Sequence, residues 1–319
     1  MQMTLDPQAK RILEVLGKNP APKLLDLPFQ QIRAAAADAN RPKIVPEVAQ
    51  VKDIEFPGVI GLMRVRVYNP NPQASSPQPA LIYIHGGGWC LDSIESHDSV
   101  CRGLANQADL VVLSTDYRLA PEHPFPAGLE DCYAATQWIC SNAQQLKLDP
   151  TRIALGGDSA GGNLTAAVLM LAHERHGASI AFQLLLYPCV HMMAQTESRT
   201  AFARGYLLDP ESLDWILDSY GGGHDVSNPL LSPLLAEDLG FMPPALVVTA
   251  GYDILRDEGK QYADSLQQQG VKCTYKCYEG LIHGFMNHMY IWQLDVAEQA
   301  TAFCAKHLKE ALNSTTRHP

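Results

Sequence analysis

The chain has 319 residues, and 24 Lys and Arg against 34 Asp and Glu give it a formal charge of −10. This acidic balance argues against a nucleic-acid binder that acts through bulk positive charge. The length argues against a small scaffold held together by disulfides. With 46% hydrophobic and 18% charged residues, the composition is typical of a folded globular protein, built either as one domain with an insertion or as two domains.

The sequence also bears on the compartment. No window reaches the roughly 18 consecutive apolar residues of a membrane-spanning helix, and the N-terminal segment lacks the apolar stretch of a secretory signal. We therefore expect a cytoplasmic protein without a membrane span. The eight cysteines are scattered, mostly within apolar runs, which favours reduced and buried thiols over disulfides.

Two stretches of helical length open the chain, at residues 8–18 and 28–39, with no strand between them. Short apolar segments rich in β-forming residues then recur and predict strands. These segments are residues 51–56, 62–68, 80–85, 110–115, 152–157, 182–187, 245–250 and 272–278. The first two alternate in polarity, as an antiparallel edge hairpin does, and the next five are apolar almost throughout, as strands covered on both faces are.

Segments of helical length and period separate the later strands. They cover residues 93–107, 126–144, 159–174, 255–269 and 291–311. Strands that alternate with helices predict an α/β fold, in which helices flank a mainly parallel sheet on both faces. Residues 1–45 and 190–225 fall outside this order, and we expect them to form a helical cap over the ligand site. Residues 46–189 and 226–319 would then be the two parts of the main α/β domain.

The strongest local motif is Gly157-Asp158-Ser159-Ala160-Gly161, between a predicted strand and a predicted helix. A Gly-x-Ser-x-Gly pentapeptide is common by chance, but at a strand-to-helix turn it is typical of a serine nucleophile, because the tight turn needs small neighbours. The following helix directs its free N–H groups toward developing negative charge. A glycine-rich junction that merely packs tightly is the alternative.

A second motif, His85-Gly86-Gly87-Gly88-Trp89, follows another predicted strand. Successive glycines expose backbone N–H groups that can stabilise a substrate oxyanion. A flexible turn or a phosphate-binding loop are the alternatives, and the phosphate reading is poor because neither the P-loop pattern nor the dinucleotide pattern is present. Together with the serine motif, the glycine run predicts an oxyanion loop.

Asp253 and His283 are the predicted partners of the serine. Asp253 comes just after the seventh predicted strand, where sheet enzymes keep functional groups, and His283 lies in the loop after the eighth. A serine hydroxyl needs a base to take its proton, and the base needs an acid to fix its tautomer. Asp257 and Glu258 are weaker candidates, since acidic residues are favoured in the first turn of a helix for other reasons.

These motifs resemble those of a known family of enzymes. Together with DYRLAPEHPFPA at 116–127 and DILRDEG at 253–259, they resemble the hormone-sensitive-lipase-like branch of the α/β-hydrolase esterases, over about 200 residues and in the family's order. The resemblance implies an α/β-hydrolase fold with about eight strands and a helical cap. Ile254 departs from the family, which usually has Pro after the acid.

The resemblance also implies an activity, namely hydrolysis of carboxylic esters by Ser159, Asp253 and His283 through an acyl-enzyme. It implies oxyanion donors from the backbone N–H groups of Gly87, Gly88 and Ala160, and no metal or organic cofactor. Many relatives are dimers, so a homodimer is a further expectation.

The substrate is expected to be a small ester with a short to medium acyl chain, because an apolar cap suits a covered pocket. Candidate substrate-binding residues are Trp89, Tyr187, Phe202, Tyr206 and Trp215. Packing between the cap and the core is the alternative role for the cap aromatics. The same serine machinery would also suit a lactone, a carbamate or an amide. A non-catalytic small-molecule receptor on the same fold is the alternative from another functional class.

Overall fold

The computed structural model describes residues 3–18 and 28–314, so that residues 19–27 of the predicted cap lie outside the described residues. Eight strands form one sheet in the order β1-β2-β4-β3-β5-β6-β7-β8. The strands are β1 (Gln50–Pro57), β2 (Leu62–Asn69), β3 (Gln78–Ile84), β4 (Val111–Thr115), β5 (Leu148–Asp158), β6 (Phe182–Leu186), β7 (Ala245–Tyr252) and β8 (Cys273–Ile282). Each corresponds to a strand predicted from the sequence, and the α/β fold class is confirmed.

The sheet is parallel from β4 through β3 to β8, and its antiparallel part is the β1–β2 hairpin, which joins β4 through β2. Neighbouring residues of the central strands point to opposite cores: on β3, Leu81 and Tyr83 contribute to one core, and Ile82 and Ile84 contribute to the other. Because both faces of these strands are covered, their sequences are apolar throughout instead of alternating.

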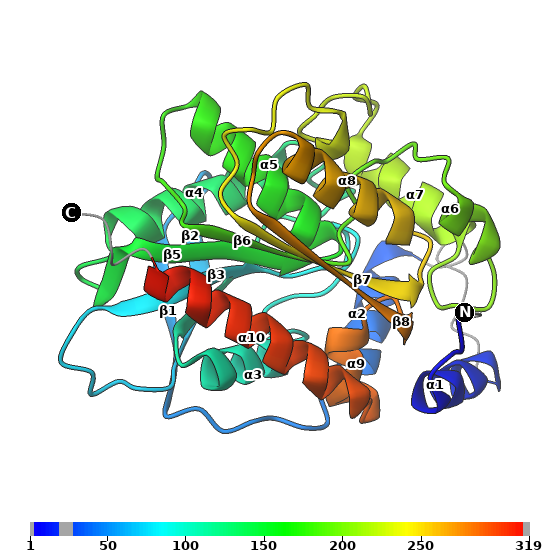
Figure 1. Ribbon diagram of the computed structural model, residues 1–319, viewed down its shortest axis with the longest axis horizontal. Coiled ribbons are helices and arrows are strands. Elements are labelled where there is room, and N and C mark those ends of the chain that lie inside the picture. The colour runs from blue at the N-terminus through cyan, green and yellow to red at the C-terminus, as the bar shows by residue number, and fades with distance from the viewer. Residues whose placement is uncertain (1–2, 19–27, 315–319) are drawn as a thin grey trace.

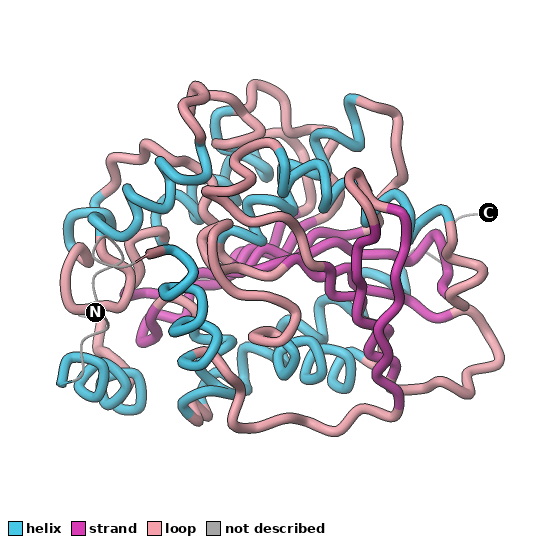
Figure 2. Tube along the Cα trace, turned by 180° about the vertical axis from the view of Figure 1, so that it is seen from behind, coloured by secondary structure: helices cyan, strands magenta, loops and turns pink. Residues whose placement is uncertain are grey.

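Helices cover both faces of the sheet, as the tube view also shows (Figure 2). The helices are α1 (Pro7–Lys18), α2 (Phe29–Ala39), α3 (Asp98–Ala108), α4 (Ala127–Ser141), α5 (Ala160–Glu174), α6 (Glu197–Ala201), α7 (Pro210–Gly221), α8 (Arg256–Gln268), α9 (Phe285–Trp292) and α10 (Val296–Ser314). Helices α3 and α10 lie on one face, and α4, α5 and α8 on the other (Figure 1). This three-layer arrangement places the carboxyl ends of β5, β7 and β8 at one edge of the sheet.

Two predicted helices differ from the structure. The helix expected over 291–311 is two helices, α9 and α10, because Gln293 ends α9 with a left-handed backbone at φ 57°. The helix expected from residue 93 begins only at Asp98. The preceding residues form turns instead, in which the N–H of Ile94 donates to the carboxylate of Asp116 at 3.1 Å.

The segments predicted to form the cap take two different positions. Helix α2 packs on α7, since the rings of Phe29 and Trp215 stack with centroids 4.7 Å apart. The Arg33 side chain ties α2 to the main domain by donating to the carbonyl oxygens of Cys90 and Ala120 at 2.8 and 2.7 Å. Helix α1 instead lies beside β8 (Figure 1), where the N–H of Asp6 donates to the carbonyl of Gly280 at 2.9 Å.

Candidate active site

Ser159 occupies the turn between β5 and α5 with φ 55° and ψ −117°, a backbone conformation that costs a non-glycine residue about 1–3 kcal/mol. Its N–H donates to the carbonyl of Leu186 on β6 at 2.8 Å, which holds the turn against the sheet. The turn approaches β3 so closely that a Cβ on Gly157 or Gly161 would collide with the carbonyl oxygen of Ile84. The two glycines of the motif are therefore required by this close approach.

His283 joins Ser159 to Asp253. Its Nε2 lies 2.9 Å from the Ser159 Oγ, and its Nδ1 lies 2.7 Å from the Asp253 Oδ2. The other carboxylate oxygen of Asp253 accepts the N–H of Leu255 at 2.9 Å, so that both oxygens are engaged. The three residues follow β5, β7 and β8 directly, and the parallel order of these strands brings them together although 124 positions separate Ser159 from His283.

The charge on His283 depends on its burial and on the neighbouring carboxylate of Asp253. Asp253 has no exposed side-chain surface, and the His283 side chain is 12% exposed. Burial disfavours the charged imidazole, but the neighbouring carboxylate of Asp253 outweighs this effect and raises the pKa of His283. The arrangement can therefore take a proton from the serine hydroxyl and stabilise the resulting imidazolium.

The loop that contains Gly87 and Gly88 borders the same cavity as the serine. Gly87 and Gly88, both at positive φ, line one cavity together with Ser159 and Ala160. Among the described residues, the N–H groups of Gly87, Gly88 and Ala160 have no hydrogen-bond acceptor. A Cβ on Gly88 would meet the side chain of Ile216 at 2.7 Å, so the loop also packs against α7. These amides are available to an anionic oxygen next to the serine.

The cavity around Ser159 has a volume of about 290 Å³, close to the lower end of the range for small-molecule sites. One part of its wall is apolar and comes from residues 207–216, from the residue before α8 and from α9: Leu207, Leu208, Leu213, Ile216, Leu255 and Ile291. Another part is polar: Asn40, Asp92, Asn287 and His288. Burial lowers the pKa of His288 to about 4, so this ring is neutral near pH 7 and can only donate or accept a hydrogen bond there.

Of the five aromatic residues predicted to bind substrate, Trp89 alone is among the described residues that line this cavity. The rings of Tyr187 and His283 meet edge to face, with their centroids 5.1 Å apart. Phe202 and Tyr206 pack on each other and on Tyr252, and Trp215 stacks on Phe29 of α2. In the structure these four rings pack on neighbouring rings, and their role in substrate binding stays a prediction.

The apolar side chains that do line the cavity include residues that the sequence analysis missed, such as Leu208, Leu213 and Ile216. They carry no motif, and their one signal is their position in residues 190–225, which fall outside the alternation of strands and helices. Asn40 and Asn287 were missed as well, since isolated amides are common on surfaces. Within residues 3–18 and 28–314, no three His, Cys, Asp or Glu side chains gather as metal ligands.

The chain is similar to several known proteins. A family model described as "alpha/beta hydrolase fold" matches residues 81–287. The chain is 44% identical over 244 residues to the carboxylic ester hydrolase LipN of Mycobacterium tuberculosis, a match that covers 74% of this chain and 64% of LipN. It is 38% identical over 278 residues to the carboxylesterase NlhH of the same species, covering 86% of each chain.

A solved structure is similar over nearly the whole chain. It is the ester hydrolase EH1AB1 from the metagenome of Lake Arreo, in complex with a derivative of bipyridine phosphonate. The TM-score is 0.92 at 40% sequence identity, and the match covers 96% of this chain and 99% of that one. This similarity confirms the α/β-hydrolase fold, with its mostly parallel sheet and flanking helices.

Proposed function

This chain belongs to the α/β-hydrolase family, in its hormone-sensitive-lipase-like branch, and from this membership we propose that it is a serine carboxylesterase for small esters. The observation that carries the proposal is the continuous row Ser159–His283–Asp253, with contacts of 2.9 and 2.7 Å. This row opens into a cavity that also holds unpaired backbone amides. The names of LipN and NlhH as ester hydrolases agree with this chemistry.

The proposed reaction begins when the Ser159 Oγ attacks the ester carbonyl while the His283 Nε2 takes its proton. The tetrahedral oxyanion is held by the N–H groups of Gly87, Gly88 and Ala160. His283 then protonates the departing alcohol, which leaves an acyl-enzyme on Ser159. In the second half His283 activates a water molecule, and hydrolysis of the acyl-enzyme releases the acid.

The shape of the cavity supports esters with a short to medium acyl chain. Its volume of about 290 Å³ is small, and its apolar wall of leucines and isoleucines offers burial to a hydrocarbon chain. We assign the cover of the cavity to a cap built from α2, α6 and α7, consistent with the stacking of Phe29 on Trp215. Helix α1 lies apart from this cover, beside β8.

The test of the proposal is hydrolysis of p-nitrophenyl esters from acetyl to dodecanoyl by the wild-type chain and by Ser159→Ala. We expect the rate to be highest for short to medium chains and to fall by several orders of magnitude in the variant, which keeps its fold. A fluorophosphonate should label the wild-type chain on the peptide that contains Ser159. Binding without turnover by the wild type would favour a receptor, and near-normal turnover by the variant would contradict the assignment of the serine.

A parallel panel of a lactone, a carbamate and an amide decides which acyl bond the site cleaves best. Faster turnover of one of these than of any ester would replace the ester proposal.

The described residues contain no helix long and apolar enough to cross a membrane. The cytoplasmic location and the homodimer remain predictions, and fractionation of cells and sedimentation of the purified chain test them.

A further inference from the structure

A second histidine–aspartate pair lies directly behind the serine turn. His97, which precedes α3, is 1% exposed, and Asp158, which precedes Ser159, is 4% exposed. The His97 Nε2 lies 3.1 Å from Oδ1 and 3.3 Å from Oδ2 of Asp158. The proposed proton transfer uses neither residue, so the pair needs an explanation of its own.

The hydrogen bonds around His97 determine its protonation. The Ser96 Oγ donates its one proton to the carbonyl of Ser93 at 2.9 Å, so it faces the His97 Nδ1, also at 2.9 Å, as an acceptor. An ionised carboxylate is an acceptor only, so the Nε2 beside Asp158 must carry a proton too. With the Ser96 proton assigned to the Ser93 carbonyl, both ring nitrogens of His97 are donors, as they are in an imidazolium.

The remaining neighbours of the ring are compatible with this charge. The Nδ2 of Asn287 on α9 lies 2.7 Å from the His97 Nε2. Because an amide NH₂ group is a donor only, a proton on Nε2 requires the amide to be turned over, so that its oxygen faces the ring. Tyr83 and His85 approach from β3, with ring centroids 6.2 and 5.7 Å from the ring of His97. Asp92 adds a second negative charge nearby.

Electrostatics acts in the same direction. Burial opposes the charge on His97, but Asp158 outweighs it and raises the pKa of the ring. Burial also opposes the charge on Asp158, but His97 lowers the pKa of that carboxyl. The pKa of His85 is lowered by burial and by the charge of His97, so His85 stays neutral. One ion pair, Asp158⁻–His97⁺, is thus enclosed behind the serine.

Asp158 connects His97 to the glycine loop that carries the proposed oxyanion donors. Its Oδ1 accepts the N–H of Gly86 at 3.0 Å and the hydroxyl of Tyr83 at 2.8 Å. A carboxylate that lost its cation would lose its charge or its position, and the amide of Gly86 would lose a charge-assisted bond. Because Gly86 precedes the two glycines that hold the oxyanion, its displacement would move both donors.

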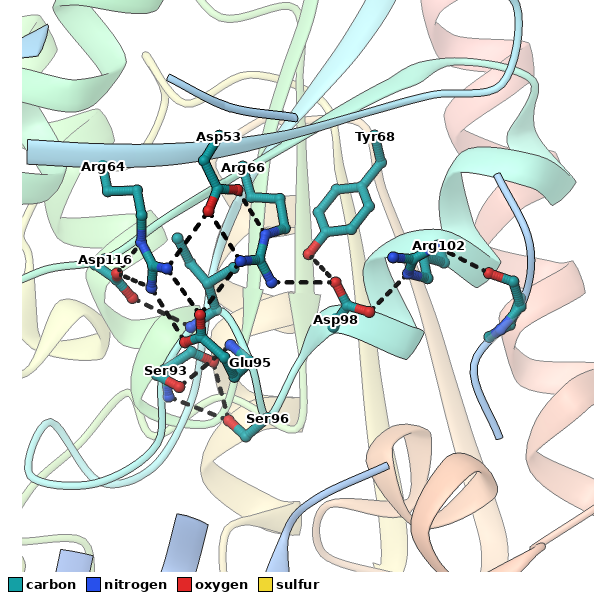
Figure 3. A network of polar contacts seen from close by, with 12 residues as sticks. Asp53, Arg64, Arg66, Tyr68, Ser93, Glu95, Ser96, Asp98, Arg102 and Asp116 are labelled. Atoms are coloured by element: carbon teal, nitrogen blue, oxygen red, sulfur yellow. Dashed lines mark hydrogen bonds and ion pairs between the residues drawn. The ribbon is translucent and has the colours of Figure 1, made fainter. Parts of the chain in front are cut away.

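His97 itself sits on a fixed segment. Figure 3 shows that residues 93–98 are held on both sides: Glu95 and Asp98 bond to arginines of β2, and Ser93 and Ser96 bond to each other. Arg64 donates to Glu95 at 2.8 Å, and Tyr68 donates to Asp98 at 2.9 Å. The imidazolium is therefore presented to Asp158 by a rigid loop, as a preorganised electrostatic group requires.

Resting on the proposed esterase function, we propose that His97 is a positioning residue for the oxyanion loop. As a permanent imidazolium it keeps Asp158 ionised, and Asp158 in turn holds the Gly86 amide and with it the Gly87 and Gly88 donors. The role is electrostatic and geometric, and no proton leaves His97 during the reaction.

The kinetic test compares His97→Leu and His97→Gln, with His307→Gln on α10 as the control. His307 faces the carbonyl of Phe303 one turn earlier on the same helix, at 2.9 Å, away from Asp158 and the glycine loop. We expect His97→Leu to lower kcat by about 10²-fold, as loss of one oxyanion donor does, with KM changed by less than about threefold. His97→Gln keeps an N–H toward Asp158 without the charge and should fall between. A trifluoromethyl ketone, whose adduct carries an oxyanion, should lose the same factor in affinity.

A double-mutant cycle between His97 and Asp158 distinguishes a positioning role from a role in packing alone. If His97 acts through Asp158, then adding His97→Leu to Asp158→Asn should cost much less than it costs alone. Equal costs in both backgrounds, or a fall in kcat without loss of ketone affinity, would overturn the proposal.

The charge on His97 can be measured without an activity assay. In ¹⁵N-labelled wild-type protein at pH 7.5, both ring nitrogens of His97, assigned by through-bond correlation to the backbone of the wild-type chain, should show protonated shifts. A bare nitrogen in that ring would overturn the proposal even if the variants failed to fold. A wild-type chain that hydrolyses no ester would sink the proposed function and leave this measurement standing. An active wild type with an unchanged His97→Leu variant would sink the present proposal alone.

Discussion

The exchange Asp253→Asn tests the proton arrangement of the site most sharply, because both carboxylate oxygens are engaged. Oδ1 accepts the N–H of Leu255 at 2.9 Å, and Oδ2 faces the His283 Nδ1 at 2.7 Å. An asparagine that keeps its oxygen toward Leu255 must turn its NH₂ group toward His283. Nδ1 then becomes an acceptor, and the ring proton moves to Nε2, which faces the Ser159 Oγ and can no longer take its proton.

The magnitude follows from two factors. The reverse amide orientation restores the tautomer but sets two donors, the NH₂ group and the Leu255 N–H, face to face, at a cost of about 1–3 kcal/mol for the buried unsatisfied group. That cost leaves roughly a tenth to a hundredth of the molecules with a usable base. The neutral amide also stabilises the imidazolium less than the carboxylate does, by about 1–2 kcal/mol. The two costs together come to about 2–5 kcal/mol, so we expect kcat to fall by about 30- to 5,000-fold, which approaches the loss of about 10⁴-fold from the same exchange in serine proteases.

Steady-state hydrolysis of p-nitrophenyl butyrate at pH 8 measures this loss, with Asp257→Asn as the control. Asp257 is bonded to Arg256 and to the N–H of Ser198, outside the row of three, and its variant should keep most of the rate. The two variants should unfold in urea at similar concentrations. A fall of less than about tenfold in Asp253→Asn would refute the assignment of this residue as the partner of the base.

Three further outcomes are expected. Since Asp253 outweighs burial and raises the pKa of His283, and only the neutral ring accepts a proton, kcat should rise with pH along a limb whose midpoint lies above the usual imidazole value of about 6.5; a pH–rate profile with a midpoint below about 6 would contradict this. Gly88→Ala places a Cβ against Ile216 at a positive φ and should lower kcat by about 10²-fold, whereas Gly205→Ala, at a positive φ in open space, should leave the rate near that of the wild type. Arg199→Met removes the cation that pairs with Glu258, whose side chain is fully buried, and should reduce the free energy of unfolding in urea by about 3–5 kcal/mol; a reduction below about 1 kcal/mol would show that the bonds from Val190 and His191 to this carboxylate suffice.

Much of the molecule could be predicted from short stretches of sequence. A buried parallel strand must be apolar on both faces, so each of β3 to β7 stands out in the sequence. A nucleophile at a strand-to-helix turn needs small neighbours, so Gly157 and Gly161 mark Ser159. Asp253 and His283 were identified because each directly follows a strand, and the catalytic roles of all three stay predictions until the variants are measured.

The split of the last helix at Gln293 and the late start of α3 were not predictable in this way. The start of α3 depends on a contact from another part of the chain, since the carboxylate of Asp116 accepts the N–H of Ile94. The split depends on the left-handed backbone of Gln293, a residue type that does not mark a helix end. Trp215 illustrates the same limit, since an aromatic side chain in a cap has the same appearance in sequence whether it faces a ligand or another helix.

The sequence by itself determined the strand order along the chain, the serine turn and the loops that carry Asp253 and His283, because each depends on the backbone and side-chain requirements of a few consecutive residues. The tertiary structure alone decided which side chains line the cavity and which groups face each histidine ring. Ring protonation depends on partners brought together by folding: His97 meets Asp158 across 61 positions of sequence, and no local pattern records that meeting.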